Sequence, residues 1–174
     1  VLDRRGWAEA VVKPVISAAA TRTWRVSRAS ASAIESQLAE SLELGDVMVQ
    51  PFIAEIQTRG EWSLMFFDGE FSHAVRKMPI EGDFRVQTGF GGRSAVEQPS
   101  DAVLGAVRRV LEAAPSPWLY VRVDGIETAN GYLQLELEML EPSLFLAQNQ
   151  EAPARFADAI VRVIARQSGA IKSN

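Results

Sequence analysis

The chain has 174 residues, close to the length of one typical domain of about 150 residues, which predicts one compact unit of one or two lobes. Hydrophobic residues make up 47% and charged residues 23%, a balance that is typical of globular proteins and excludes a disordered chain. The formal charge is −4 and no segment concentrates Lys and Arg, so nucleic-acid binding is disfavoured.

The residue inventory also limits the chemistry. There is no cysteine, which excludes disulfides, thiolate metal sites and cysteine nucleophiles, and His73 is the one histidine. A metal site would therefore use oxygen ligands, which favours magnesium, manganese or calcium. No apolar run approaches the roughly 20 residues of a membrane span and no targeting segment is visible, so we expect a cytoplasmic protein that does not contact membranes.

The first third of the chain predicts a hairpin and a helix. Residues 9–17 and 23–27 have the composition of two short strands that pair with each other. Ser30 or Ser32 is then expected to cap a helix with apolar residues four positions apart, and Gly45 ends it.

The middle of the chain predicts a second hairpin. After an apolar segment at 47–53, strands at 62–67 and 71–78 are joined by the turn pair Asp68-Gly69. Residues 79–100 hold four glycines among charged residues, which predicts a long, mobile loop with a functional role.

The last part predicts a capped helix, two more strands and a closing helix. Ser100 caps a helix that stops before Pro115, and strands follow at 118–124 and 132–140. The closing helix carries four hydrophobic residues, Phe156, Ile160, Val163 and Ile164. Hairpins interrupted by helices predict an α+β fold, an antiparallel sheet with helices against one face.

Acidic side chains alternate along the last two strands. Gln134, Glu136 and Glu138 are predicted to share one face of their strand, and Asp124 joins them if the strands pair. One interpretation is an ordinary solvated surface. The other is a site where Mg²⁺ binds Asp124, Glu136 and Glu138 together with phosphate oxygens and water. Only a phosphate-binding group nearby would separate the two.

Three basic residues are candidates for that phosphate-binding group, namely Lys13, Lys77 and Arg85. Lys13 interrupts an apolar strand, which is unfavourable unless its ammonium reaches solvent or an anion. A solvated lysine and a solvated loop arginine remain the common alternatives. His73 is assigned no role, because no nucleophilic serine stands at a recognisable spacing from it.

Several segments taken together resemble the ATP-grasp superfamily. They are VVKP (11–14), VMVQPFI (47–53), GEWSL (60–64), DFRVQTGFGG (83–92), RVD (122–124), LELE (135–138) and EPS (141–143). The resemblance extends from residue 10 to residue 146. Within the superfamily, this segment is similar to the glutathione synthetase and D-cycloserine cyclo-ligase branches. It implies an ATP-grasp domain over residues 1–174 with antiparallel sheets, flanking helices and two lobes hinged near 50–53. The N-terminal substrate domain of that family is expected to be absent.

The resemblance also implies roles for individual residues. Lys13 would contact the ATP phosphates, and Glu61 would hold the ribose hydroxyls. Lys77 and Arg85 would act at the γ-phosphate and the acyl phosphate. The adenine would bind the hinge backbone at Gln50, Pro51, Phe52 and Ile53. The magnesium ligands would be Asp124, Glu136 and Glu138.

The activity implied is an ATP-dependent carboxylate–amine ligase, or an intramolecular cyclo-ligase, that forms an acyl phosphate. It would use ATP with two Mg²⁺ ions or with Mn²⁺, act on a small carboxylate and an amine, and is compatible with a homo-oligomer. Two departures from the family are Glu138, where Asn is common, and residues 17–20, where a glycine-rich loop is expected. The alternatives are a catalytically impaired nucleotide-binding module and a non-enzymatic α+β interaction domain.

Overall fold

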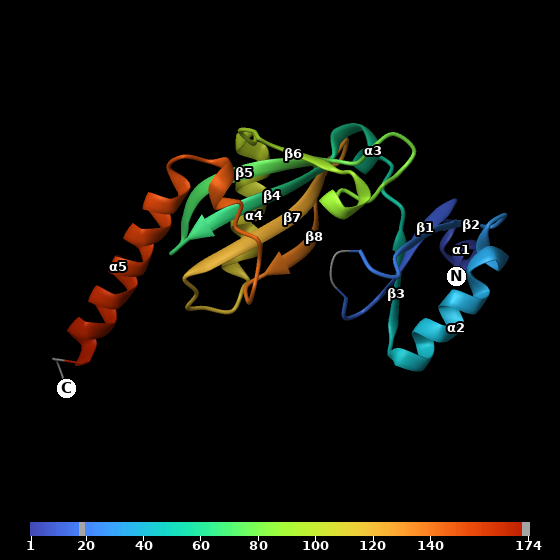
Figure 1. Cartoon of the computed structure of the whole chain (residues 1–174), viewed down its shortest axis with the longest axis horizontal. Helices are drawn as coiled ribbons and strands as arrows, with labels where there is room; N and C mark the ends of the chain where they lie inside the picture. Colours follow the sequence, from blue (N-terminus) through green and yellow to red (C-terminus); the bar gives the residue numbers. More distant parts are fainter. Residues whose placement is uncertain (18–19, 172–174) are drawn as a thin grey trace. The chain divides into compact units, whose positions relative to one another are not determined.

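The computed structural model describes residues 1–17 and 20–171 (Figure 1). Side chains are described up to residue 168. The chain divides into two compact units, Val1–Ala54 and Glu55–Asn174, which are described separately here. Two of the residues in the expected phosphate-covering turn, 18 and 19, lie outside the described residues.

The first unit is a small antiparallel sheet with short helices. Its strands lie in the order β2-β1-β3, so the predicted hairpin of the first two strands is confirmed. Ala10, Val12 and Val26 form its core, with Trp24 and Leu38 packed against them. The elements are α1 (Leu2–Arg5), β1 (Glu9–Pro14), β2 (Trp24–Ser27), a 3-10 turn (Ala31–Ile34), α2 (Glu35–Leu44) and β3 (Val47–Pro51).

The predicted serine cap of α2 is wrong. A 3-10 turn precedes the helix, so that its N-cap is Ile34, which makes no side-chain cap hydrogen bond. Ser30 instead accepts a hydrogen bond from the Ser27 backbone N–H at 2.9 Å, so its hydroxyl stabilises the end of β2. Gly45 ends the helix as expected.

The second unit is built on a five-stranded antiparallel sheet in the order β6-β5-β4-β7-β8. The antiparallel α+β class is therefore confirmed. The elements are α3 (Glu55–Arg59), β4 (Glu61–Phe67), β5 (Glu70–Met78), a 3-10 turn (Thr88–Phe90), β6 (Arg93–Val96), α4 (Asp101–Glu112), β7 (Tyr120–Thr128), β8 (Gly131–Glu138), a second 3-10 turn (Leu146–Gln148) and α5 (Ala152–Ile171).

Two local predictions in this unit have different outcomes. Ser100 caps α4, because its hydroxyl accepts a hydrogen bond from the Val103 backbone N–H at 3.3 Å. The segment 79–100 is not only a loop, since Arg93–Val96 forms the edge strand β6 against β5. A four-residue edge strand has few side-chain contacts to reveal it in the sequence.

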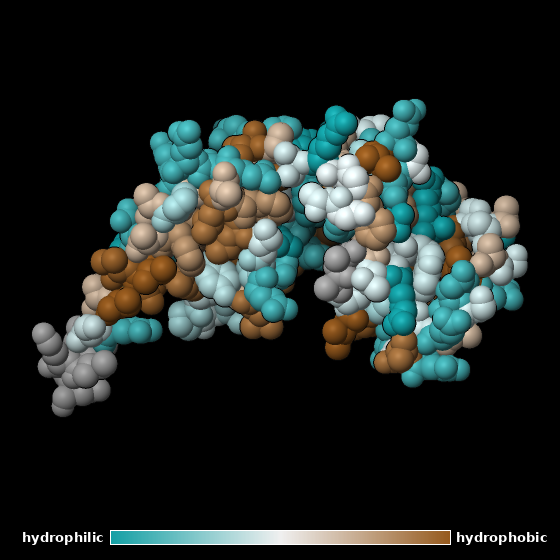
Figure 2. All heavy atoms as spheres, viewed as in Figure 1, coloured by the Kyte–Doolittle hydropathy of each residue, from teal (hydrophilic) through white to brown (hydrophobic). Residues whose placement is uncertain are grey.

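Helices lie on both faces of the sheet, and not on one face as predicted. Leu64 and Phe66 of β4 pack in the cluster that includes α4 residues, and Met65 and Phe67 pack in the cluster that includes α5 residues. Side chains alternate along a strand, so α4 and the first half of α5 cover opposite faces. The rest of α5 leaves hydrophobic side chains at the surface (Figure 2), and Ile164 is 56% exposed. No helix among the described residues is long and apolar enough to cross a membrane.

A candidate metal and phosphate site on the sheet

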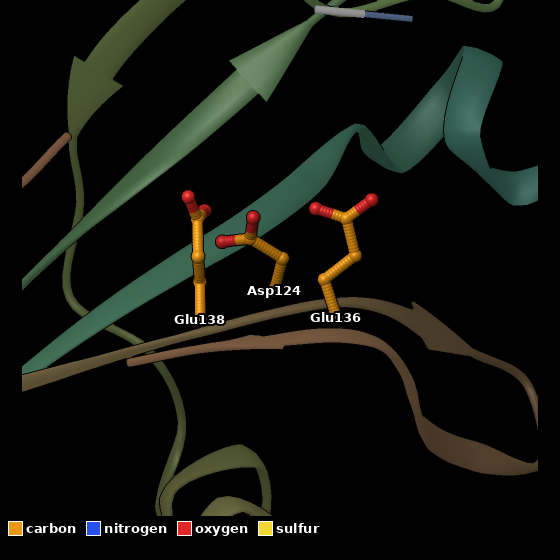
Figure 3. A group of neighbouring side chains, drawn as sticks. All are labelled: Asp124, Glu136 and Glu138. Atoms are coloured by element: carbon orange, nitrogen blue, oxygen red, sulfur yellow. The ribbon is translucent and has the colours of Figure 1, made fainter. Parts of the chain in front are cut away.

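Strand pairing brings three acidic side chains together. Asp124 of β7 lies directly opposite Glu136 of β8, and Glu138 is two residues further along the same face. The three residues each place a carboxylate oxygen within 4.8 Å of the others (Figure 3). The predicted pairing of the two strands, and the shared surface for the three carboxylates, are thus confirmed.

Gln134 does not share this surface, so that part of the prediction is wrong. The strand register shifts by one residue at Leu135, because Asp124 pairs with Glu136 while the next residue, Gly125, pairs with Gln134. A bulge of this kind breaks the two-residue alternation. Gln134 instead lines a hollow of about 500 Å³ with Leu137 and residues of α4, on the opposite face.

Asp124 is buried and surrounded by hydrogen-bond donors. Ser63, its direct neighbour on β4, donates to Asp124 Oδ1 at 2.6 Å. Arg122 donates through Nε to Oδ1 at 3.0 Å, and its Nη2 lies 3.0 Å from Oδ2. Lys77 Nζ is 3.6 Å from Oδ2. The carboxylate is therefore neutralised by residues of its own chain and not by solvent.

Lys77 and Glu61 form an ion pair beside Asp124. Burial raises the pKa of Glu61, a rise that the Lys77 charge opposes and does not cancel. Burial alone would lower the pKa of Lys77, but the charges of Glu61 and Asp124 outweigh it, so the pKa is raised and the ammonium stays charged. The structure thus places Glu61, predicted to hold the ribose, in the same cluster as Lys77 and Asp124.

The other two carboxylates differ in their environments. Glu138 forms an ion pair with Arg122, and burial raises the pKa of this carboxyl in spite of the Arg122 charge. Glu136 is exposed and has no hydrogen bond or ion pair with any described residue. Four carboxylates therefore face two cations, Lys77 and Arg122. Carboxylate oxygens with excess negative charge are the ligands that Mg²⁺ or Mn²⁺ prefers, so the residues present fit such an ion.

Two residues of this cluster were given no role by the sequence reasoning, Ser63 and Arg122. Arg122 was expected on the face of Asp124, because it stands two positions before it in the strand. Ser63 had no signal in the sequence, since its contact depends on β4 lying beside β7.

Arg85 is not joined to the carboxylates by any contact of the described residues. It forms an ion pair with Asp83 at 2.7 Å and lies 3.7 Å from the centre of the Phe90 ring. Its role at a phosphate stays a prediction.

The remaining predicted nucleotide residues belong to the first unit. Lys13 lies opposite Met48 in the β1–β3 pair. Gln50 and Pro51 end β3, and the Phe52 backbone N–H donates to Glu9 O at 3.1 Å. The predicted roles of Lys13 and of residues 50–53 stay predictions.

Comparison with known proteins gives the family. Residues 4–127 match the ATP-grasp domain of prokaryotic glutathione synthetase, and the chain belongs to this ATP-grasp family. Over 162 residues it is 33% identical to the cycloserine biosynthesis protein DcsG of Streptomyces lavendulae, covering 87% of this chain and 54% of that protein. The chain thus spans about half the length of this relative.

Solved structures agree with the family. The crystal structure of D-cycloserine synthetase DcsG superimposes with a TM-score of 0.76 at 29% identity, over 92% of this chain and 58% of that one. The D-alanine–D-alanine ligase from Bacillus anthracis complexed with ATP gives a TM-score of 0.66 at 18% identity, over 97% and 56% of the two chains. The second of these shows a shared fold.

Proposed function

We propose that this chain is the ATP-binding region of a ligase that joins a small carboxylate to an amine with release of ADP and phosphate. The observation that carries the proposal is the convergence of Asp124, Glu136 and Glu138, with carboxylate oxygens within 4.8 Å of one another. They stand beside two largely buried cations, Lys77 and Arg122, in a chain of the ATP-grasp family. An ordinary solvated sheet surface would not be expected to bury Asp124 or to place Lys77 and Arg122 beside it.

The three carboxylates would hold Mg²⁺ or Mn²⁺ through their oxygens. When bound with ATP, such an ion withdraws negative charge from the phosphates. Lys77 would place its ammonium at the transferring phosphoryl group, where its raised pKa keeps it charged. Arg85 would act there too, once released from Asp83.

The nucleotide contacts in this proposal are those that the family resemblance implies. Lys13 would contact the phosphates, the backbone of residues 50–53 would bind adenine, and Glu61 would hold the ribose.

The reaction balances without a covalent protein nucleophile. An oxygen of the substrate carboxylate attacks the γ-phosphorus, the bond to the β-phosphate oxygen breaks, and ADP leaves. The amine nitrogen then attacks the acyl carbon of the acyl phosphate, phosphate leaves, and the nitrogen loses a proton. The similarity to a cycloserine biosynthesis protein supports a small amino-acid-like substrate, in which carboxyl derivative and amine belong to one molecule and the product is a ring.

The test combines nucleotide binding with turnover. With Mg-ATP at 100 times its dissociation constant, we expect about 2.7 kcal/mol of stabilisation in thermal or urea unfolding. Glu136→Gln should abolish ADP release in a screen of small amino acids while leaving the fold intact, because Glu136 makes no internal contact that the structure needs. The matched control is Glu112→Gln, an exposed position at the end of α4, which should keep full activity.

Each outcome has a defined meaning. Full activity in Glu136→Gln contradicts the metal assignment. Mg-ATP binding with no ADP release from any carboxylate and amine indicates a nucleotide-binding module without catalysis. No stabilisation by Mg-ATP indicates an interaction domain whose acidic face is only solvated.

A further inference from the structure

Arg122 already forms ion pairs with two of the three carboxylates in the candidate metal site. Its Nη2 lies 3.0 Å from Asp124 Oδ2 and also pairs with Glu138. The same guanidinium donates through Nη1 to the Ser143 carbonyl oxygen at 3.2 Å. A cation of the chain is thus bound to carboxylates that the proposed function assigns to a divalent cation.

Both oxygens of the Asp124 carboxylate already face donors of the chain. A carboxylate offers about four lone-pair sites. On Oδ1 they accept from Ser63 and from Arg122 Nε, at 2.6 and 3.0 Å. Oδ2 faces Arg122 Nη2 and Lys77, at 3.0 and 3.6 Å. Arg122 Nε also reaches Oδ2, at 3.1 Å, so Arg122 donates to both oxygens. A metal ion that binds Asp124 must therefore compete with donors already placed on both oxygens.

Of the three donors, Arg122 is the one whose release would free the most carboxylate oxygens for a metal ion. Ser63 is fully buried on β4 and bonds only to Asp124 in this cluster, and Lys77 is held by Glu61. Arg122 alone among the three is shared by Asp124 and Glu138. Its release exposes oxygens of two ligands in one step, and the remaining Ser143 contact is to a neutral carbonyl.

We propose that Arg122 is a built-in counter-cation of the metal-free site, which a divalent cation displaces from Asp124 and Glu138 when it binds. This inference rests on the proposed function, because it takes the three carboxylates as the metal ligands. It assigns Arg122 a positioning role: the residue holds the carboxylates together before the metal arrives and sets how strongly the metal must compete. The guanidinium and a divalent cation are both positive and approach the same carboxylate oxygens, so each weakens the binding of the other there.

The first measurement is metal binding without nucleotide. Mg²⁺ is titrated by calorimetry, and Mn²⁺ by electron paramagnetic resonance, into the wild type and Arg122→Met. We expect the variant to bind either ion at least about tenfold more tightly, the scale of removing one unit charge at close range. The control is Arg166→Met, which removes the same charge from an exposed pair with Asp68 and should bind as the wild type does.

The second measurement reports on Arg122 itself in the intact site. In a ¹H–¹⁵N spectrum of the metal-free wild type, the Arg122 Nε–H signal is identified by its loss in Arg122→Lys. Because this N–H donates to Asp124, we expect Mg²⁺ to shift its signal and speed its exchange with water. This arm uses the wild-type chain, so it decides the question even if Arg122→Met does not fold.

The results separate the inference from the function on which it rests. If Mg²⁺ binds the wild type while the Nε–H signal stays in place, or if Arg122→Met binds Mg²⁺ no more tightly, Arg122 is not displaced and only this inference fails. If Mg²⁺ and Mn²⁺ bind neither the wild type nor the variant, the metal site fails and the inference fails with it.

Discussion

The hydrogen bond from Ser63 to Asp124 should be one of the strongest single contacts in the second unit. Ser63 is fully buried, and its hydroxyl donates to Asp124 Oδ1 at 2.6 Å. The Ser63→Ala substitution removes this donor and leaves a buried carboxylate with less compensation. The loss of stability should therefore be that of a hydrogen bond to a charged group.

A second buried serine supplies the comparison. Ser72 lies on β5 at 5% exposure, and its hydroxyl is 2.9 Å from Nδ1 of His73. Nε2 of this ring must carry the proton because it faces the Leu144 carbonyl oxygen at 3.0 Å, so Nδ1 accepts from Ser72. Burial lowers the pKa of His73, which keeps the ring neutral at pH 7.5. Ser72→Ala thus removes a hydrogen bond between neutral groups.

Hydrogen bonds to charged groups contribute about 1.5–3 kcal/mol and those between neutral groups about 0.5–1.5 kcal/mol. Urea unfolding at pH 7.5 with EDTA should therefore show a free-energy loss for Ser63→Ala that is about twice the loss for Ser72→Ala. The two substitutions remove the same atom from buried strands, so the comparison cancels the effect of size. Equal losses would refute the reasoning, because they would show that Asp124 does not depend on Ser63 for its neutralisation.

Two other predictions test side chains around the same sheet. The buried Tyr132 hydroxyl has no hydrogen-bond partner among the described residues, so Tyr132→Phe should leave the free energy of unfolding unchanged or raise it by up to about 1 kcal/mol. The Arg85 guanidinium and two backbone N–H groups lower the pKa of Asp83 from 3.8 to about 2, against the effect of burial. In Arg85→Met, carbon-13 NMR titration should find this pKa raised toward 3.8. Because the folded-state pKa is the lower one, this pair stabilises the fold above pH 3.8, and the contribution disappears as the pH falls through about 2.

Each of these predictions has a control within the chain. The chain's other tyrosine, Tyr120, donates to the Leu140 carbonyl oxygen at 2.6 Å, so Tyr120→Phe should lose about 1 kcal/mol in the same assay. A comparable loss in Tyr132→Phe would mean that its hydroxyl has a partner after all. For Asp83 the control is Arg93→Met, an exposed arginine in β6, which should leave the Asp83 pKa near 2. An unchanged value in both variants would exclude Arg85 as the cause.

The sequence by itself determined much of the local structure and which acidic side chains share one face. The turn pair Asp68-Gly69 and the Ser100 cap were predictable because each depends on neighbouring residues. The acidic face was predictable because side chains alternate along a strand, which places Glu136 and Glu138 on one side wherever the strand lies. These residue types alone left two interpretations open, a solvated acidic surface and a site for a hard cation.

Only the tertiary structure decided which groups meet at that site. The register shift at Leu135 moved Gln134 to the opposite face, and the pairing of β4 with β7 placed Ser63 beside Asp124, 61 residues away in the chain. The pairing of β7 with β8 likewise placed Arg122 opposite Glu138, with which it forms an ion pair. Alternation and capping depend on backbone geometry over a few residues, whereas strand order and register depend on how the whole core packs. For that reason the sequence predicted the carboxylates, and the fold supplied the donors that surround them.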